Sequence, residues 1–507
     1  MTLHLSVMLW MPAVFGLLAL VLPRRAAGWV ALLGSLGALA YTIALVVDFE
    51  KGAGLQYVTD ESWISALGMH YKLGVDGINL FLVVLTALAF SFAVLWAVLE
   101  NDPTRPRERE RQFFFWMSLG HSTVLGALLA QDLALFVAFF DLMLVPFFFL
   151  TGVWGGPGRV AAVTKLFIYT LVGSLLMLAA AIATGVLSGG DGGPTFVLSE
   201  LQQVALAEES QRWIFLCFAA AFLVKMPAFP FHGWMPDGYR EMPLPALAVF
   251  SAVLSKVAAY GFLRIVFPLF PDAVADFQLL MLVLALASIL YGSAMAFTTT
   301  EARLILGYSS MAQLGFIVLG VFALQEDGAQ GAILQSVNHG LVTVPAFFIV
   351  GLLIARAGGS GDIRDMGGVA FRAPVLAALF LVVALATLAM PGSSNFVGEF
   401  LILLGVFRDH VVIACVAFTG VVLASVYMLR MFIRAMHNRV GPAVESRDLR
   451  FGDVLVLGPL VAVIIALALY PQLPIEKGER DINGSIVGAQ QADGQEIATH
   501  PEIQVIR

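Results

Sequence analysis

Charge is scarce in this sequence. Aspartate, glutamate, lysine and arginine make up 12% of the 507 residues, whereas 60% of the residues are hydrophobic. An average soluble domain carries about twice that share of charge. The composition therefore excludes an ordinary soluble protein, and the hydropathy peaks leave no room for a separate soluble domain. We expect the lipid bilayer to surround this chain, and no nucleic acid among its partners.

Cysteine is also scarce, and the common nucleotide-binding motifs are absent from the sequence. The two cysteines, Cys217 and Cys415, stand alone inside apolar runs. Their placement excludes a disulfide framework and the ligand spacing of iron–sulfur or zinc sites. The sequence contains no Gly-x-Gly-x-x-Gly and no P-loop, which argues against a nucleotide site. We therefore expect no cofactor and no metal on this chain.

Apolar runs of about 20 residues recur from end to end, and this is the length that crosses roughly 30 Å of hydrocarbon. They predict an all-α polytopic membrane protein with about fourteen transmembrane helices. The first run, Leu3–Leu22, is too long for a signal-peptide core and lacks a basic start, so it reads as helix 1. The polar tail after Pro471 is expected to be short and irregular. The spans lie near residues 3–22, 27–49, 78–99, 112–130, 132–151, 161–188, 211–231, 244–270, 277–299, 303–324, 329–356, 374–407, 410–437 and 452–471.

Lysine and arginine predict the orientation, because loops rich in them stay in the cytoplasm. Loops after even-numbered helices carry few basic residues, namely Lys51, Lys72, Arg212 and Arg408, with Arg264 near a helix end. Loops after odd-numbered helices carry many more: Arg24, Arg25, Arg105, Arg107, Arg109, Arg111, Arg159, Arg240, Arg303, Arg356, Arg364, Arg372 and the cluster from Arg430 to Arg450. The odd loops should therefore face the cytoplasm, leaving both termini outside it.

Two predicted spans are interrupted by proline. Helix 7 runs into Lys225-Met226-Pro227, and helix 12 meets Met390-Pro391-Gly392 before it resumes at Phe396. Proline removes an amide donor, and in lipid the freed carbonyls need protein or cavity water. Broken helices five spans apart suggest a duplicated five-helix unit, whose odd helix number inverts the second copy, as in many transporters. The alternative is that these prolines only kink packed helices.

This duplication divides the chain into four parts. Residues 1–111 hold helices 1–3, residues 112–270 the first repeat (helices 4–8), and residues 271–440 the second repeat (helices 9–13). Residues 441–507 hold helix 14 and the polar tail.

Four ionisable residues lie deep inside the apolar runs: Asp141, Lys225, Lys256 and Glu399. A charge at the bilayer centre costs at least roughly 2.5–3.5 kcal/mol. Lys256 stands about 15 Å into its span by helical rise, too far for its side chain to reach either interface. Two carboxylates and two amines on four spans predict a relay for small cations, above all protons.

An Asp141–Lys225 ion pair across helices is expected, because an unpaired carboxylate at that depth would be neutral and idle. A purely structural ion pair is the alternative, and Lys225 is near enough to its helix end to snorkel. His339 in helix 11 could bridge two halves of a proton path, since histidine titrates near neutrality, or could be structural. Lys165 could be an inner link in the relay or an interfacial anchor. Other polar residues are expected to be structural or anchoring: His121, His232, Arg264 and Arg430.

Six motifs occur in order along the chain: Tyr71 to Leu80, Lys165 to Thr170, Lys225 to Asp237, Lys256 to Gly261, Gly307 to Ser310, and Asn395 to Phe400. Through them the sequence resembles the antiporter-like membrane chains of respiratory complex I, the proton-pumping NADH–quinone oxidoreductase, over nearly its whole length. Related chains L and N and the large subunits of sodium/proton antiporters typically carry lysine where Glu399 stands. Glu399 and the short tail make the resemblance closest to chain M.

The resemblance implies that Asp141 and Lys225 form the first half-channel, that Lys256 is the central link and that Glu399 ends the second half-channel. It implies neighbours of the L and N type, and partner subunits that carry NADH, FMN, iron–sulfur clusters and quinone. Two departures matter. The family usually has glutamate at Asp141, and many bacterial relatives have histidine at Gln313.

Three hypotheses follow from the sequence. The first is a proton-translocating subunit without a redox centre of its own, coupled to quinone chemistry elsewhere in a complex. The second is a subunit of a sodium/proton antiporter that uses the same relay. The third is a structural chain whose charges only hold helices together.

Overall fold

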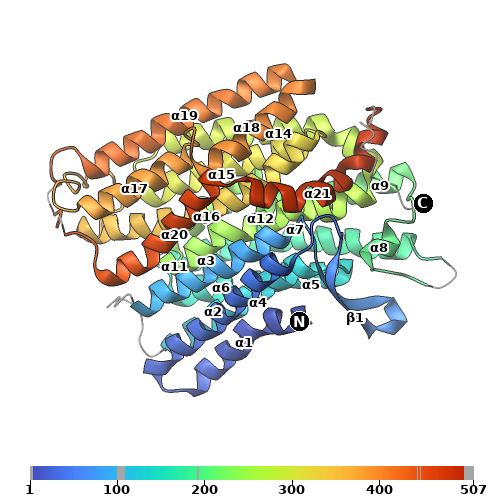
Figure 1. Ribbon diagram of the computed structural model, residues 1–507, viewed down its shortest axis with the longest axis horizontal. Helices are drawn as coiled ribbons and strands as arrows, with labels where there is room; N and C mark the ends of the chain where they lie inside the picture. The colour runs from blue at the N-terminus through green and yellow to red at the C-terminus, as the bar shows by residue number, and fades with distance from the viewer. Residues whose placement is uncertain (1–3, 100–108, 191–192, 442, 446, 496–507) are drawn as a thin grey trace.

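The computed structural model describes residues 4–99, 109–190, 193–441, 443–445 and 447–495. They form a bundle of tilted helices with one small β-hairpin (Figure 1). The N-terminal part consists of α1 (Leu5–Val21), α2 (Arg24–Asp48), β1 (Gln56–Ile64), the 3₁₀ turn η1 (Ser65–Leu67), β2 (Met69–Val75) and α3 (Leu80–Leu99).

The first predicted repeat contains several short elements. In chain order they are α4 (Glu110–Leu129), α5 (Leu133–Leu142), α6 (Leu144–Trp154), α7 (Arg159–Leu187), α8 (Leu198–Leu201), α9 (Glu208–Lys225), the 3₁₀ turn η3 (Phe231–Trp234), α10 (Met235–Glu241), α11 (Leu244–Val249), the π-helical η4 (Phe250–Leu254), α12 (Ser255–Gly261), the π-helical η5 (Phe262–Val266) and α13 (Phe267–Leu269). The last five elements, from α11 to α13, form one span, Leu244–Leu269. This span is the eighth helix expected from the sequence and is called helix 8 below, as distinct from the short α8.

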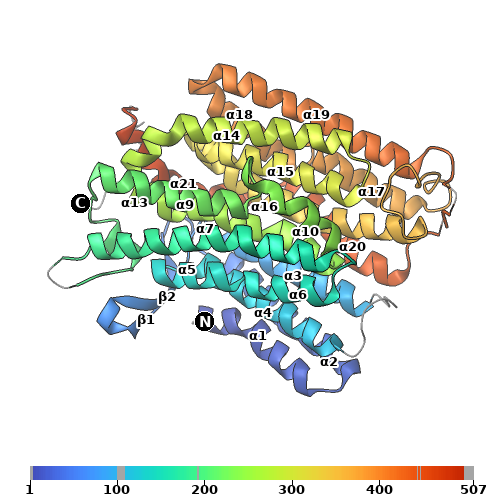
Figure 2. The ribbon, with the colours of Figure 1, turned by 180° about the vertical axis from the view of Figure 1, so that it is seen from behind.

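The second predicted repeat and the C-terminal part are built from longer helices. They are α14 (Pro271–Thr298), α15 (Ala302–Val321), α16 (Glu326–Arg356), α17 (Pro374–Thr387), α18 (Ser394–Asp409), α19 (Val411–Met436), α20 (Phe451–Leu469) and α21 (Gln472–Ala492). Figure 2 shows α7, α9 and α14 side by side along the back of the bundle, in agreement with their packing contacts.

Ten helical segments of the described ranges are long and apolar enough to cross a membrane. Two shorter apolar helices, α1 and α17, accompany them. Every span expected from the sequence coincides with one of the observed helices or with a consecutive set of them. The structure confirms a largely helical polytopic protein; fourteen crossings and the inverted repeats stay predictions.

Both expected helix breaks are confirmed. Helix 7 stops when α9 ends at Lys225, and the chain resumes regular structure only at η3. Helix 12 is split into α17 and α18 by residues 388–393. The prolines of these segments remove amide donors, so the ladder of helix hydrogen bonds cannot continue through them.

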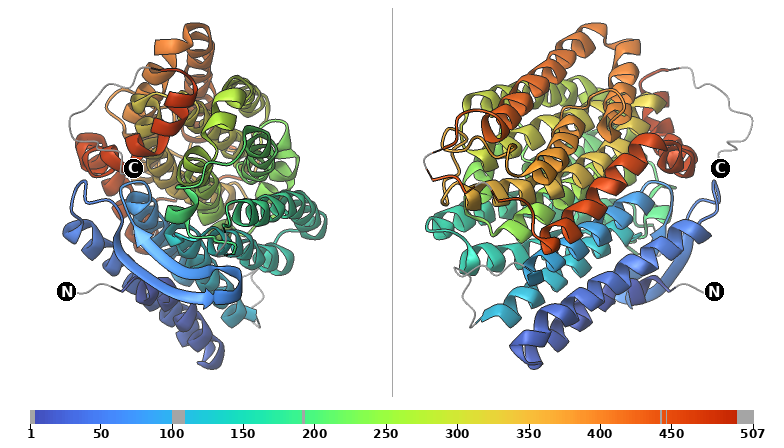
Figure 3. Two further views of the ribbon diagram at one scale, coloured as in Figure 1. Left: turned by 90° about the vertical axis from the view of Figure 1, so that its right-hand side faces the viewer. Right: turned by 60° about the vertical axis from the view of Figure 1, so that its left-hand side comes forward.

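The strictly all-α prediction is wrong at one place, the β1–β2 hairpin. This antiparallel pair places Asp60 opposite Lys72 and Ser62 opposite His70. The Asp60 carboxylate lies 2.9 Å from the Lys72 ammonium and 2.7 Å from Nδ1 of His70. The hairpin is short and mostly polar, and a search for apolar spans passes over such a segment. Figure 3 shows it lying across one end of the bundle.

The prediction of an irregular tail is also wrong, because the chain beyond Pro471 forms α21. Its buried residues recur at helical spacing and pack against α13, α14 and α16. Only this narrow stripe is buried, so the mean hydropathy of the segment stays low. The buried stripe consists of Pro474, Gly478, Ile482, Asn483, Ser485, Ile486, Ala489 and Gln490.

Burial divides the helices into an inner and an outer group. The span Leu244–Leu269 and α15 are fully buried inside the chain, and α16 is mostly so. Helices α2, α7, α19 and α20 keep most of their apolar surface exposed, as lipid-facing helices do. Most polar residues in the middle of the inner group are therefore shielded from bulk water and from lipid.

Candidate functional site

Lys225, the last residue of α9, is buried against α5. Its ammonium donates a hydrogen bond to the carbonyl oxygen of Phe140 at 3.0 Å. It also lies 4.2 Å from the centre of the Phe140 ring, within the range of a cation–π contact. The amine is thus held by the residue that precedes Asp141.

Asp141 has a different partner. Its carboxylate accepts a hydrogen bond from Ser174 Oγ of α7 at 2.5 Å. Asp141 and Lys225 interact electrostatically, but within the described residues they form no direct ion pair, contrary to the sequence expectation. The aspartate side chain is one methylene shorter than glutamate, and Ser174 holds its carboxylate on the side of α7.

Helix 5 is broken shortly after Phe140, whose carbonyl binds the Lys225 ammonium. Helix α5 ends at Leu142 and α6 starts at Leu144, with Pro146 in its first turn. Pro146 has no amide proton, so the Leu142 carbonyl four residues earlier has no helical donor, and regular hydrogen bonding is interrupted just after Phe140. This break is not among those expected from the sequence, although Pro146 signals it.

Lys256 occupies the middle of the buried helix 8, between the π-helical segments η4 and η5. Its ammonium donates to the Ser251 carbonyl at 2.7 Å and to Ser255 Oγ at 3.3 Å. In a π segment each carbonyl is offered five residues onward, and such segments often mark functional sites. Ser251 Oγ in turn accepts from the hydroxyl of Tyr239 at 3.0 Å. Lys256 is buried, as the sequence predicts, and neutral oxygens surround its charge.

His339 lies on α16, which packs against α12 and α18. The ring is buried, and its Nε2 lies 3.3 Å from Thr343 Oγ1. The other ring nitrogen, Nδ1, has no hydrogen-bond partner among the described residues. Lys256 and His339 interact electrostatically, so the histidine stands next to the central lysine on the side of the second half.

Glu399, near the start of α18, is held by two glutamines. Gln313 of α15 donates to Oε1 of Glu399 at 2.6 Å, and Gln335 of α16 donates to the side-chain oxygen of Gln313 at 2.7 Å. Gln335 also lies 3.4 Å from Glu399 Oε1 and stands one helical turn before His339. The amide of Gln313 thus takes the place expected for a histidine. Gln335 is not among the site residues expected from the sequence, since a glutamine inside an apolar helix carries no charge.

The break of helix 12 adds further buried polar groups. Asn338 of α16 donates its side-chain amide to the Ser394 carbonyl at 2.7 Å. Polar side-chain atoms of Ser393, Ser394 and Asn395 are buried without a hydrogen-bond partner in the part of the chain that the structure describes. Buried polar atoms of this kind are usually satisfied by water, so a hydrated segment beside Glu399 fits the local chemistry.

Lys165 stands apart from the buried set. Its ammonium pairs with Asp237 of α10 at 2.9 Å, and both side chains are 43% exposed. His121 stacks on Phe90, and His232 packs against Phe229 and Tyr291.

The two arginines expected to be anchors behave differently. Arg430 donates to the carbonyl of Phe297 at the protein surface. Arg264 is almost fully buried and paired with Asp76, so the anchor interpretation is wrong for Arg264. Within the described ranges, no group of three or more histidine, cysteine, aspartate or glutamate residues could hold a metal ion.

Comparison with known proteins places this arrangement in a family. A family model described as NADH:quinone oxidoreductase/Mrp antiporter, TM matches residues 130–424. NADH-quinone oxidoreductase subunit M of Mycobacterium tuberculosis is 35% identical over 540 aligned residues, covering 98% of this chain and 96% of that protein. The subunit of the same name from Rhodobacter capsulatus is 34% identical, covering 89% and 88%.

Solved structures agree with these relatives. A chain of respiratory complex I from Thermus thermophilus with bound NADH superimposes with a TM-score of 0.88 at 31% identity, over 96% of this chain and 100% of that one. A chain of the Mrp complex from Dietzia sp. shares the fold, with a TM-score of 0.82 at 22% identity over 97% and 98%. The family model covers more than half of the residues, and the curated relatives exceed 30% identity along most of the length. The chain therefore belongs to the NADH:quinone oxidoreductase/Mrp antiporter family of membrane proteins.

Proposed function

We propose that this chain is the proton-translocating, antiporter-like subunit M of a bacterial NADH–quinone oxidoreductase. It moves protons across the membrane while quinone is reduced elsewhere in the complex. The observation that carries the proposal is the buried series of polar groups from Lys225 past Lys256 to Glu399. Within the described residues its members are hydrogen-bonded to neutral oxygens and amides and form no direct ion pair that would fix their protonation.

The relay has two halves that meet at Lys256. In the first half, Asp141 and Lys225 stand beside the breaks of helices 5 and 7 and interact electrostatically. A change in charge at this pair alters the field on Lys256, whose ammonium then gives up one proton and becomes a neutral amine. In the second half, His339 is placed to accept that proton on Nδ1 and to pass one on towards Glu399 through water.

Lys165 belongs to the rim of this relay. Its ammonium is bound to Asp237 in a half-exposed position, and Asp237 lies in the helix that follows the break after Lys225. We place Lys165 at the uptake side, where it tunes the local field rather than carrying the proton through the interior.

The topology that we propose contains fourteen crossings, two inverted five-helix units and both termini outside the cytoplasm. It is supported by the basic residues of the odd-numbered loops and by the two breaks spaced five spans apart. We propose that its neighbouring subunits in the complex are antiporter-like chains of the L and N type. NADH, FMN, iron–sulfur clusters and quinone would be held by partner subunits, since the two cysteines of this chain are isolated.

The second candidate is a subunit of a sodium/proton antiporter. The fold shared with the Mrp complex chain favours it. The lower sequence identity of that chain, and a carboxylate at position 399 where the antiporter subunits carry lysine, favour the complex I function.

The test measures NADH-driven proton uptake and the quinone-reductase rate in sealed membrane vesicles with matched amounts of assembled complex. Lys256→Met keeps the volume of the side chain and removes its charge, so it should lower the number of protons moved per NADH. Glu209→Gln, at an exposed position at the start of α9, is the control and should change nothing. Wild-type pumping by assembled Lys256→Met would refute the proposal. Proton movement that needs sodium and ignores NADH would support the antiporter instead.

A further inference from the structure

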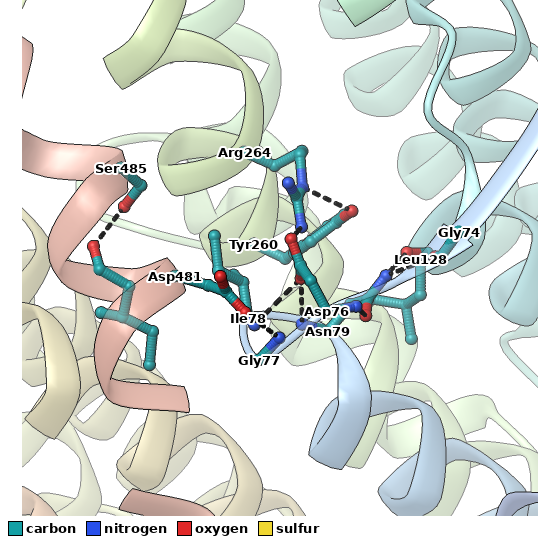
Figure 4. A network of polar contacts seen from close by, with 11 residues as sticks. Gly74, Asp76, Gly77, Ile78, Asn79, Leu128, Tyr260, Arg264, Asp481 and Ser485 are labelled. Atoms are coloured by element: carbon teal, nitrogen blue, oxygen red, sulfur yellow. Dashed lines mark hydrogen bonds and ion pairs between the residues drawn. The ribbon is translucent and has the colours of Figure 1, made fainter. Parts of the chain in front are cut away.

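A second buried charged cluster lies at the end of helix 8, outside the relay described above. Arg264 is paired with Asp76, the residue directly after β2, and its Nε donates to the Tyr260 hydroxyl at 3.1 Å. The other carboxylate oxygen of Asp76 accepts the amide of Ile78 at 3.0 Å. Figure 4 shows these groups converging between helix 8 and the start of α3.

A third member of this cluster comes from the C-terminal helix. Asp481 of α21 accepts a hydrogen bond from the backbone amide of Gly77 at 2.7 Å (Figure 4). It interacts electrostatically with Asp76, Arg264 and its neighbour Arg480. Burial and the nearby charge of Asp76 raise the pKa of the Asp481 carboxyl above its ordinary value, which favours a group that binds and releases a proton.

These residues line a cavity of about 600 Å³ beneath α21. Its wall includes Asp76, Arg264 and Asp481 together with Gln202, Arg480 and Ser485. The loops around it follow helices 2, 6 and 8, which the distribution of basic residues assigns to the outer side of the membrane.

The sequence of helix 8 connects this cavity to the central lysine. Lys256, Tyr260 and Arg264 follow one another at intervals of four residues, so they lie on one face of the helix. Each step is about 6 Å along the axis, a gap that one water molecule can bridge. All three are buried or nearly so, and Tyr260 is among the most deeply buried large side chains.

We propose, resting on the proton-translocating function above, that the cavity beneath α21 is the outer mouth of a proton route that runs from Lys256 through Tyr260 to Asp481. In a turnover that uses this route, the Lys256 ammonium gives its proton to Tyr260 instead of His339 and becomes an amine. The Tyr260 hydroxyl takes up that proton on its oxygen and gives its own proton onward. The Asp481 carboxylate becomes a neutral carboxyl and then releases the proton to water in the cavity.

Arg264 and Asp76 have a different part in this route. A guanidinium does not give up its proton in proteins, so Arg264 is a fixed positive charge beside the path. A fixed positive charge repels a passing proton, and Asp76 cancels that repulsion. Asp76 and Arg264 are therefore positioning residues, and the balance of their charges matters more than either group alone.

The experiment compares protons moved per NADH in vesicles that contain matched amounts of the assembled complex. Asp481→Asn and Tyr260→Phe should each lower the ratio, but by less than Lys256→Met does, because His339 can still accept protons from Lys256. The quinone-reductase rate is measured in parallel. Glu479→Gln carries the same charge change two residues from Asp481, at an exposed position, and should leave the ratio at the wild-type value. Tyr260→Phe removes only a hydroxyl, so it tests the route even where Asp481→Asn prevents assembly.

The charge balance has its own test. Asp76→Asn leaves Arg264 uncompensated and should slow proton transfer by about tenfold or more, because the guanidinium lies within hydrogen-bond distance of the Tyr260 hydroxyl on the path. The double variant Asp76→Asn/Arg264→Gln should bring the ratio back towards wild type. A merely structural ion pair would change the amount of assembled complex without changing protons per NADH.

The outcomes separate this route from the function on which it rests. If Lys256→Met lowers the ratio while Tyr260→Phe and Asp481→Asn keep the wild-type value, the route is wrong and the relay towards Glu399 stands. If Lys256→Met also keeps the wild-type value, the proposed function itself fails.

Discussion

The two halves of the relay hold their charges in different ways. In the first half a carboxylate and an amine lie close together, yet each is bound by a neutral group, Ser174 Oγ for Asp141 and a backbone carbonyl for Lys225. In the second half a single carboxylate, Glu399, is bound by a glutamine amide. A direct ion pair would fix both protonation states, whereas neutral partners leave each charge able to change. We infer that the charge state of the first half sets the electrostatic field on Lys256. The second half then accepts the proton that Lys256 releases.

The largest effect is expected from removing the amine of the first half. Lys225→Ala takes away the charge that faces Asp141, and it should abolish most quinone-coupled proton movement in a complex that still assembles. Breaking a buried charged arrangement typically costs several kcal/mol. The measurement is proton uptake per NADH, with Lys51→Ala, an exposed lysine paired with Glu476, as the control. Normal pumping by the assembled Lys225→Ala complex would remove the first half from the mechanism.

The next effect concerns the second half. Glu399→Gln should reduce proton transfer severely, whereas Glu399→Lys should restore part of it by supplying another titratable group. Two unit charges about 8 Å apart at an effective dielectric of about 20 interact by roughly 2 kcal/mol, or about 30-fold in a rate. Proton uptake at matched levels of complex distinguishes the variants. Full activity of Glu399→Gln would show that this carboxylate carries no proton.

The shorter carboxylate of the first half gives a sharper comparison. Asp141→Glu should retain activity because the longer side chain reaches towards Lys225, whereas Asp141→Asn should lose most of it. The same assay measures both. Equal activity of the wild type and Asp141→Asn would show that the charge of Asp141 is not needed for proton transfer, and it would favour a structural role for this residue.

The glutamine contacts of the second half should have a moderate effect. Gln313→Leu removes the donor that binds Glu399 and should slow proton transfer, since a hydrogen bond to a charged group contributes about 1.5–3 kcal/mol. Gln313→His retains a donor and should stay closer to wild type. If Gln313→Leu pumps as well as Gln313→His, the hydrogen bond from Gln313 to Glu399 does not contribute to proton transfer.

The smallest effect is expected at the rim. Lys165→Gln breaks a half-exposed ion pair with Asp237, and exposed pairs contribute about 0–1 kcal/mol. Proton uptake should fall only slightly, and the loss should shrink further at high salt because salt screens exposed charges. A loss as large as that of Lys225→Ala would move Lys165 into the interior path.

Much of this arrangement follows from the sequence, because membrane burial makes charge conspicuous. Lys256 and Glu399 stand out for this reason, and proline marks the breaks after Lys225 and before α18. Neutral hydrogen-bond partners cannot be recognised in this way, because they carry no charge that stands out in an apolar run. Gln335, Ser174 and the Phe140 carbonyl acquire their roles only when distant helices meet.

Two further features depend on packing and not on composition. The π-helical turns around Lys256 have no distinctive residue pattern, because they arise from how helix 8 fits between its neighbours. The pairing of Arg264 with Asp76 joins residues far apart in the chain, and a helix-end position suggested an anchor instead. Helix α21 was missed because only its narrow inner stripe is apolar.

Helix α21 also has a consequence for the order in which the protein is made. It contacts early and late parts of the chain together, through Asp481 to Gly77 and through Gln490 to the carbonyl of Leu324. As the last described helix it leaves the ribosome after every helix that it joins. The two halves can thus insert and pack one after the other, and the link between them closes only after α21 has been made.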